Sequence, residues 1–220
     1  MKKYVTLSYD DGAKFDRPFV EMLNAYGIKC TFNLISSSMP PSDRDAWYVS
    51  REEARELYRG HEIATHSLTH PHLEQLSKED IEHEIREDIK NLTEIAGYPV
   101  LGHAYPYGTY NELVVDTLRE IGIRYARTVK ATSAFDPPED PLLFHPTTHH
   151  RNPEVFRLID EFLAAEPKDH DLVFYLWGHS FELDRGEEFN SWAHMERVLK
   201  ALSGKPDVNY VTNMEFIERR

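Results

Sequence analysis

The sequence has a single cysteine, Cys30, among its 220 residues, which excludes an intrachain disulfide. A lone thiol inside the apolar run CTFNLI is typical of a core residue in a reducing compartment. The sequence opens MKKYVTLSYDDG and has neither a signal-like apolar segment nor an apolar run of about 18 residues. These absences predict a cytoplasmic protein without a membrane anchor.

Positive charge is also scarce in this sequence. There are 25 Lys and Arg against 38 Asp and Glu, which gives a formal net charge of −13. Such a chain is repelled on average by nucleic acids and acidic membranes, so we expect neither as a partner. The hydrophobic fraction of 40% is too high for a disordered chain and sufficient for a core. None of these features indicates an oligomeric state.

Short β-branched and aromatic runs alternate with amphipathic segments along the chain. The predicted strands are YVTLSY, CTFNLI, HEIAT, a short strand with its exit loop in PVLGHAYPY, IRYARTV, LLFHPT, DLVFYLWGH and VNYVT. Helices are expected between them, with caps at Ser50, Ser77 and Asn111 and a stop at Gly97. No linker or sequence repeat divides residues 1–220. We therefore predict one α/β domain, a distorted (β/α) barrel of about seven strands, with a doubly wound open sheet as the alternative.

Candidate catalytic residues are sought where predicted strands end, because the loops of a parallel α/β fold meet at that edge. Asp10 and Asp11 follow the first strand, and adjacent carboxylates repel unless a cation or a protonated group holds one of them. His66 and His70 follow the third strand in THSLTH, where one helical turn would aim both imidazoles at the same ion. Asp11, His66 and His70 thus form the two-imidazole, one-carboxylate set of open metal sites.

Spacing alone carries little weight for this pair, because His145 and His149 repeat it. His179 ends the apolar strand LVFYLWGH and is either a satisfied core residue or a group at the same edge. The loop with Tyr105 and Tyr107 contains a proline and a glycine, which either stiffen it or aim a backbone amide at a ligand.

In this order and at these distances, TLSYDDG, THSLTH, AYPYG and LWGH resemble the motifs of the polysaccharide deacetylase family of carbohydrate esterases, also called the NodB-homology domain. The resemblance covers nearly the whole chain and implies a distorted (β/α) barrel that hydrolyses an N-acetyl or O-acetyl group on a sugar or oligosaccharide. It implies that Asp10 is the general base and His179 the general acid. It also implies that Asp11, His66 and His70 bind one divalent metal, zinc first, with iron, cobalt or nickel compatible with the same ligands.

The resemblance further implies that a backbone N–H near Tyr107 holds the oxyanion of the reaction. As exposed aromatic residues, Tyr105, Tyr107 and Trp177 are candidates for stacking on a sugar face. Core packing is the alternative for Trp177.

The sequence departs from the family at three places. Ala104 stands where the third motif usually begins with an arginine that orients the base. Arg127, in YARTV, is the candidate replacement. Strand alternation places it on the same side as Tyr125 and Val129, and if that side faces the barrel interior we expect its guanidinium to pair with Asp10; an ion pair elsewhere is the alternative. The fourth motif has no clear counterpart, so the acid has no assigned partner. Gly178 replaces a leucine of the pocket floor.

Two other functions stay open. The altered third and fourth motifs allow hydrolysis of another non-peptide C–N bond, such as that of a cyclic amide or ureide. A metal-dependent sugar-binding protein without turnover is the second alternative, and acetate release distinguishes it from an enzyme.

Overall fold

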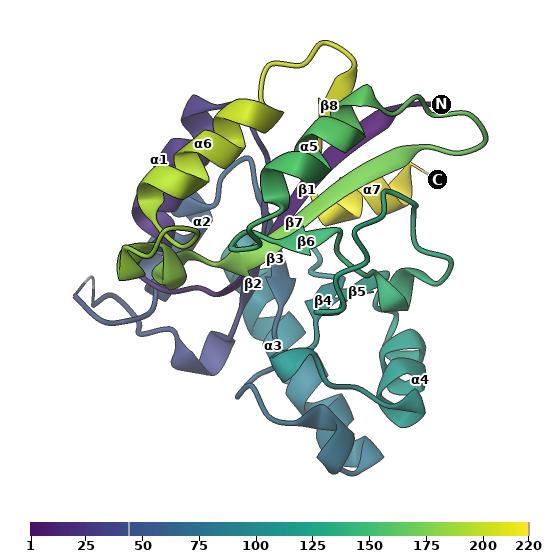
Figure 1. Cartoon of the computed structure of the whole chain (residues 1–220). Coiled ribbons are helices and arrows are strands. Elements are labelled where there is room, and N and C mark those ends of the chain that lie inside the picture. The colour runs from purple at the N-terminus through teal and green to yellow at the C-terminus, as the bar shows by residue number, and fades with distance from the viewer. Residues whose placement is uncertain (44, 220) are drawn as a thin grey trace.

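The architecture is a parallel sheet surrounded by helices (Figure 1). The computed structural model describes residues 1–43 and 45–219. The strands are β1 (Lys3–Asp11), β2 (Thr31–Leu34), β3 (Glu62–Thr65), β4 (Gly102–Ala104), β5 (Tyr125–Arg127), β6 (Thr148–His149), β7 (Leu172–His179) and β8 (Val208–Tyr210). They follow the order β5-β4-β3-β2-β1-β7-β6. The strand β8 pairs with the first residues of β1, and β2 pairs with the last residues of β1 on the same edge.

The sheet curls into a distorted barrel, because one short segment joins its two ends. Arg127 of β5 and Phe144 form an isolated parallel bridge, and the backbone N–H of Thr128 donates to the Phe144 carbonyl at 3.1 Å. A few residues later, Thr148 pairs with Leu176 of β7. The order from β5 to β1 also lacks the reversal that defines a doubly wound sheet. The predicted (β/α) barrel is therefore confirmed.

The helices begin and end near the predicted caps. They are α1 (Asp16–Ala25), α2 (Arg51–Leu57), α3 (Lys78–Ala96), α4 (Glu112–Ile121), α5 (Val155–Ala164), α6 (Trp192–Leu202) and α7 (Asn213–Glu218). Ser50 forms the predicted capping box, and the side chains of Ser77 and Asn111 each accept a backbone N–H. Gly97 ends α3 with a left-handed φ of 81°. In the described parts of the chain, every helix is too short or too polar to span a bilayer.

Two elements differ from the sequence-based prediction. LLFHPT does not form a strand: Pro141–Leu143 is a 3₁₀ turn. Pairing to β7 begins at Thr147, whose N–H donates to the Tyr175 carbonyl at 2.9 Å, and β6 itself covers Thr148–His149. Pro146 cannot donate a backbone hydrogen bond, which limits the strand on its amino side. The helix α7 was not predicted, although Thr212 and Glu215 form a capping box at its start.

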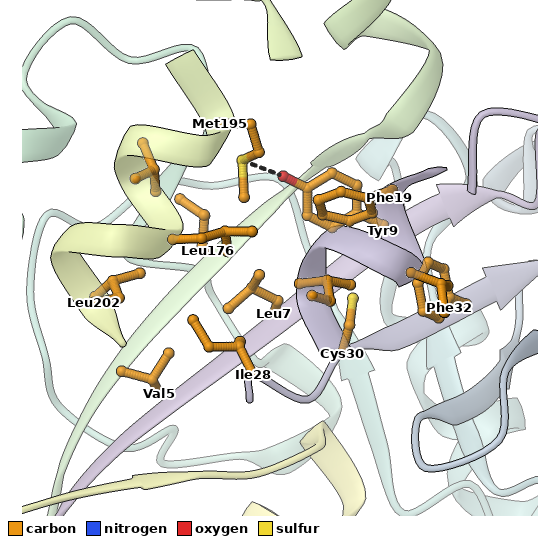
Figure 2. Packing of buried hydrophobic residues seen from close by; sticks show 14 of the residues in the cluster. Val5, Leu7, Tyr9, Phe19, Ile28, Cys30, Phe32, Leu176, Met195 and Leu202 are labelled. Carbon is orange, nitrogen blue, oxygen red and sulfur yellow. Dashed lines mark hydrogen bonds between the residues drawn. The ribbon is translucent and has the colours of Figure 1, made fainter. Parts of the chain in front are cut away.

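Alternation along β1 divides its residues between two environments. Three alternate residues pack in the main core against α1, α5 and α6: Val5, Leu7 and Tyr9. Figure 2 shows the Tyr9 hydroxyl donating to Sδ of Met195, at 3.3 Å. Cys30 is buried in the same cluster, as predicted for a core thiol. Since successive strand residues face opposite sides, Asp10 is directed into the barrel interior.

Candidate active site and metal centre

The ends of several strands open into a cavity of about 460 Å³, within the usual range for ligand pockets. The residues that line it are Asp10, Asp11, His66, His70, Tyr105, Tyr107, Gly108, Val129, Trp177 and His179. Eight of the nine sequence-predicted site residues are among them. The ninth, Arg127, is fully buried and reaches Asp10.

Asp10 is held on both oxygens. Nη2 of Arg127 donates to its Oδ2, and Nδ2 of Asn33 donates to its Oδ1 at 2.8 Å. The predicted pairing of Arg127 with Asp10 is thus confirmed, whereas Asn33 was missed. Burial raises the pKa of Asp10, but the charge of Arg127, the neighbouring His66 and His179 and the Asn33 hydrogen bond outweigh it and lower the pKa to about 2. The carboxylate is therefore ionised throughout the neutral range.

The Arg127 guanidinium is itself fixed by its neighbours. Its Cζ lies 4.5 Å from the ring centroid of Trp177, in cation–π geometry. Its Nη1 donates to the Thr128 carbonyl at 3.3 Å. The half-buried Trp177 thus both lines the cavity and covers the guanidinium.

Asp11, His66 and His70 bring three ligand atoms within 4.8 Å of one another. Nδ1 of His66 donates to the Ala104 carbonyl at 2.7 Å, and a carbonyl oxygen only accepts, so the proton is on Nδ1. The lone pair of Nε2 then faces Asp11, whose Oδ1 lies 3.7 Å away. A histidine ligand fixed through its other nitrogen is the usual arrangement at metal sites.

The protonation of these groups also suits a cation. Burial lowers the pKa of His66 to about 3 and that of His70 below its ordinary value, so both imidazoles are neutral, as ligands must be. Burial and the adjacent charge of Asp10 raise the pKa of Asp11 to about 6. A divalent ion would offset the repulsion between the two carboxylates, so the donor set fits such an ion.

His66 and His70 do not share a helical turn, which corrects the sequence-based expectation. They lie in an irregular loop where Ser67 and His70 have left-handed φ angles of 69° and 59°. Asp11 and Tyr107 have φ angles of 79° and 57°. Such conformations cost a non-glycine residue on the order of 1–3 kcal/mol each and concentrate at functional sites. Three of these four residues, Asp11, His70 and Tyr107, line the cavity.

The aromatic residues have different environments. Tyr107 is 56% exposed, and its ring stacks on His72 with a centroid separation of 4.0 Å. The expectation that Tyr105 is exposed is wrong, because the residue is 1% exposed and its hydroxyl donates to the Leu142 carbonyl at 2.9 Å. Of these three aromatic residues, Tyr107 and Trp177 are the ones that offer a ring toward a ligand.

His179 pairs with Asp10 in the β1–β7 register, and its Nε2 lies 3.9 Å from Asp10 Oδ2. On its other side, Nδ1 lies 3.6 Å from Oε2 of Glu182. Burial lowers the pKa of His179, but Glu182 and the two aspartates outweigh it and raise the pKa above its ordinary value. Sequence reasoning missed Glu182, whose only signal was a position three residues after the candidate acid.

Gly178 is required by a second histidine beneath the cavity. A Cβ at this position would lie 2.0 Å from Nδ1 of His150. The His150 ring is fully buried, and its Nδ1 lies 3.1 Å from the Tyr9 hydroxyl. The departure from the family's leucine is thus explained by the space that His150 occupies.

The fold and the strand-end cavity define a class of α/β-barrel proteins. A putative polysaccharide deacetylase from Mycobacterium smegmatis has the same fold, with a TM-score of 0.69 over 99% of this chain and 90% of that one, at 16% identity. The family model for polysaccharide deacetylase matches residues 1–126. The chain therefore belongs to the polysaccharide deacetylase family, as the motifs predicted.

Curated relatives share the N-terminal half of the chain. Peptidoglycan-N-acetylglucosamine deacetylase PgdA of Listeria monocytogenes is 28% identical over 123 residues, which are 55% of this chain and 24% of that protein. A chitooligosaccharide deacetylase of Sinorhizobium fredii is 26% identical over 122 residues, 54% of each protein. The chain thus spans a quarter to about half the length of these relatives.

Proposed function

We propose that this chain is a metal-dependent hydrolase that removes an acetyl group from an N-acetylated or O-acetylated sugar. The observation that carries the proposal is that three groups meet in one cavity. They are the carboxylate of Asp10, which Arg127 holds, the possible metal ligands Asp11, His66 and His70, and His179, whose pKa is raised. The deacetylase names of the relatives support the same reaction.

Asp11, His66 and His70 would hold one divalent cation. Zinc suits two imidazoles and a carboxylate, and iron, cobalt or nickel would suit them too. When bound, the cation would lower the pKa of a water molecule and polarise the acyl oxygen.

Asp10 acts as the general base and takes a proton from the attacking water. Arg127 keeps this carboxylate ionised and oriented, and so takes the role of the family's arginine. A backbone N–H near Tyr107 stabilises the oxyanion, and a donor of this type contributes roughly 3–4 kcal/mol.

His179 acts as the general acid. Its Nε2 is directed toward Asp10 and the cavity, so it delivers a proton to the departing sugar nitrogen or oxygen. An amine anion is a very poor leaving group, so hydrolysis of an amide depends on this proton. The products are acetate and the free amino sugar, or the free hydroxyl from an ester. The rings of Tyr107 and Trp177 give the sugar an apolar face on which to stack.

The proposal is tested by loading the protein with metal and offering acetylated amino sugars of increasing length, with detection of acetate. The matched control is Asp10→Asn, which should keep the metal and lose acetate release. Binding of sugars without acetate from any of them would favour a sugar-binding protein. Ring opening of cyclic amides or ureides instead would favour the C–N bond alternative.

A further inference from the structure

A second group of titratable side chains lies behind His179, and the proposed reaction does not use it. Glu182 is 6% exposed and lies in the 3₁₀ segment Ser180–Arg185 that follows β7. Its Oε2 faces three imidazoles: Nε2 of His149 at 3.2 Å, Nε2 of His150 at 3.6 Å and Nδ1 of His179 at 3.6 Å. A carboxylate buried in this way needs at least one cationic or donating partner.

The hydrogen bonds of His149 fix its protonation. Its Nδ1 accepts the backbone N–H of Arg151 at 3.2 Å, so that nitrogen carries no proton. The ring proton is therefore on Nε2, which is the atom directed at Glu182. His149 thus serves as a neutral donor that holds the carboxylate in place.

His150 does not compete for Glu182. Its Nε2 lies 2.9 Å from Oδ1 of Asn190, and a carboxamide oxygen only accepts, so the Nε2 proton is directed there. The remaining imidazole is His179. Among the described residues, its Nδ1 is buried and has no hydrogen-bond partner. An unpaired ring nitrogen therefore faces a buried carboxylate oxygen across 3.6 Å.

We propose that Glu182, held by His149, is the positioning residue for His179. Its carboxylate receives the Nδ1–H, fixes the ring, and leaves the Nε2 proton directed at the cavity. The proposal deepens the proposed function, because it supplies the partner that the general acid lacks in the sequence. Catalytic hydrogen bonds are commonly long in the free enzyme and shorten when substrate binds, so 3.6 Å agrees with this role.

The same three side chains, His149, His179 and Glu182, also have ligand atoms within 4.8 Å of one another. A metal held by all three would occupy Nδ1 of His179, and that nitrogen would then carry no proton. The positioning role of Glu182 and a second metal site therefore differ in whether Nδ1 of His179 carries a proton and in the number of metal ions per chain.

The test uses Glu182→Gln, which keeps the volume of the side chain and removes its charge. On an N-acetylated amino sugar, kcat should fall roughly 10–100-fold with KM within about twofold of the parent. On an aryl acetate, whose phenolate leaves without a proton, kcat should stay within about twofold. Glu182→Asp should restore part of the lost kcat on the sugar. Metal content should remain one ion per chain.

The matched control is Glu62→Gln, a buried carboxylate that accepts from Tyr125 at the opposite end of the sheet. It should lower stability without changing the ratio of sugar to aryl-acetate activity. Equal losses on both substrates in Glu182→Gln would overturn the proposal, because positioning of an acid matters only where the leaving group needs one. A second metal ion in the parent that is lost in Glu182→Gln would also overturn it.

A measurement without turnover separates this inference from the proposed function. In ¹⁵N-labelled protein, the ring nitrogens of His179 should show a proton on Nδ1 in the parent. A His179 protonated only on Nε2 would overturn the role of Glu182, whatever the activity. If the parent releases acetate from no substrate, the proposed function fails, and this spectrum still decides the pairing.

Discussion

Replacement of Arg127 by methionine tests the charge balance at the centre of the site. Arg127 is fully buried and Asp10 is 3% exposed, so the substitution leaves a buried carboxylate with Asn33 as its main partner. Methionine keeps much of the side-chain volume and the contact with Trp177, so the loss of the charge dominates.

The magnitude follows from the pKa of Asp10. The pKa falls from an ordinary value of 3.8 to about 2, a difference worth roughly 2.5 kcal/mol at 1.36 kcal/mol per unit of pKa. Without Arg127, burial disfavours the charged form of Asp10. Removal of one partner of a buried ion pair typically costs about 3–5 kcal/mol of stability. Total stabilities are about 5–15 kcal/mol, so the variant should fold with a much smaller margin.

The contribution of Asp10 to stability should change with pH in opposite directions in the parent and in Arg127→Met. In the parent, the contribution of Asp10 is present above pH 3.8 and is lost as the pH falls through about 2. In Arg127→Met, burial holds the pKa of Asp10 above its ordinary value, so stability falls as the pH rises above 3.8. The deficit of the variant should therefore be larger at pH 7 than at pH 4.5.

Urea unfolding of chelator-treated protein at these two pH values measures the effect. Asp10→Asn combined with Arg127→Met should recover stability relative to Arg127→Met alone, because it removes the unpaired charge. The control is Arg157→Met, which removes an exposed arginine paired with Glu154 and Glu161 and should cost less than about 1 kcal/mol. A loss below about 1 kcal/mol at pH 7, or additive single effects within about 0.5 kcal/mol, would refute the reasoning.

Three further predictions concern the metal, the acid and the pocket floor. His70→Ala should lose the bound metal in elemental analysis, whereas Asp10→Asn should keep it and lose roughly two to four orders of magnitude in kcat. Loss of the metal in Asp10→Asn together with its retention in Asp11→Asn would exchange the roles of base and ligand. His179→Ala should remove the alkaline limb of the kcat/KM profile, because the protonated imidazole is lost as pH rises through its raised pKa; an unchanged limb would exclude it as the acid. Gly178→Ala should cost about 1–3 kcal/mol of stability, because its Cβ would lie 2.0 Å from the His150 ring; an unchanged Tm would contradict this.

The parts of the fold that local chemistry determines could be predicted from the sequence. The caps at Ser50, Ser77 and Asn111 act within one helical turn, and all three form as expected. The segment around Phe144 was mistaken for a strand, because its pairing with β5 and then β7 depends on closure of the whole barrel. The start of α7 carried a readable signal in Thr212 and Glu215, which the prediction overlooked.

The residues of the site also fall into those that the sequence could predict and those that it could not. Strand ends identified the residues that line the cavity, since parallel strands bring their carboxyl ends together. Asn33 was missed because its role depends on the register in which β2 places it beside Asp10. Glu182 was missed because a 3₁₀ segment returns its side chain to His179, and no periodic pattern marks such a segment. The exposure of Tyr105 was misjudged because its hydroxyl finds the Leu142 carbonyl, far along the chain.

The missing arginine shows why position in the sheet predicts more than position in a motif. Ala104 and Arg127 are register partners on β4 and β5, so the charge sits one strand away from where the family's arginine is expected. Neighbouring strands are about 4.8 Å apart, a gap that a long guanidinium side chain spans easily. The Ala104 carbonyl remains free to accept the Nδ1 proton of His66. Any strand that ends at this mouth can therefore supply a group that acts on Asp10, and departures from a motif are best judged by whether the neighbouring strand offers the same charge.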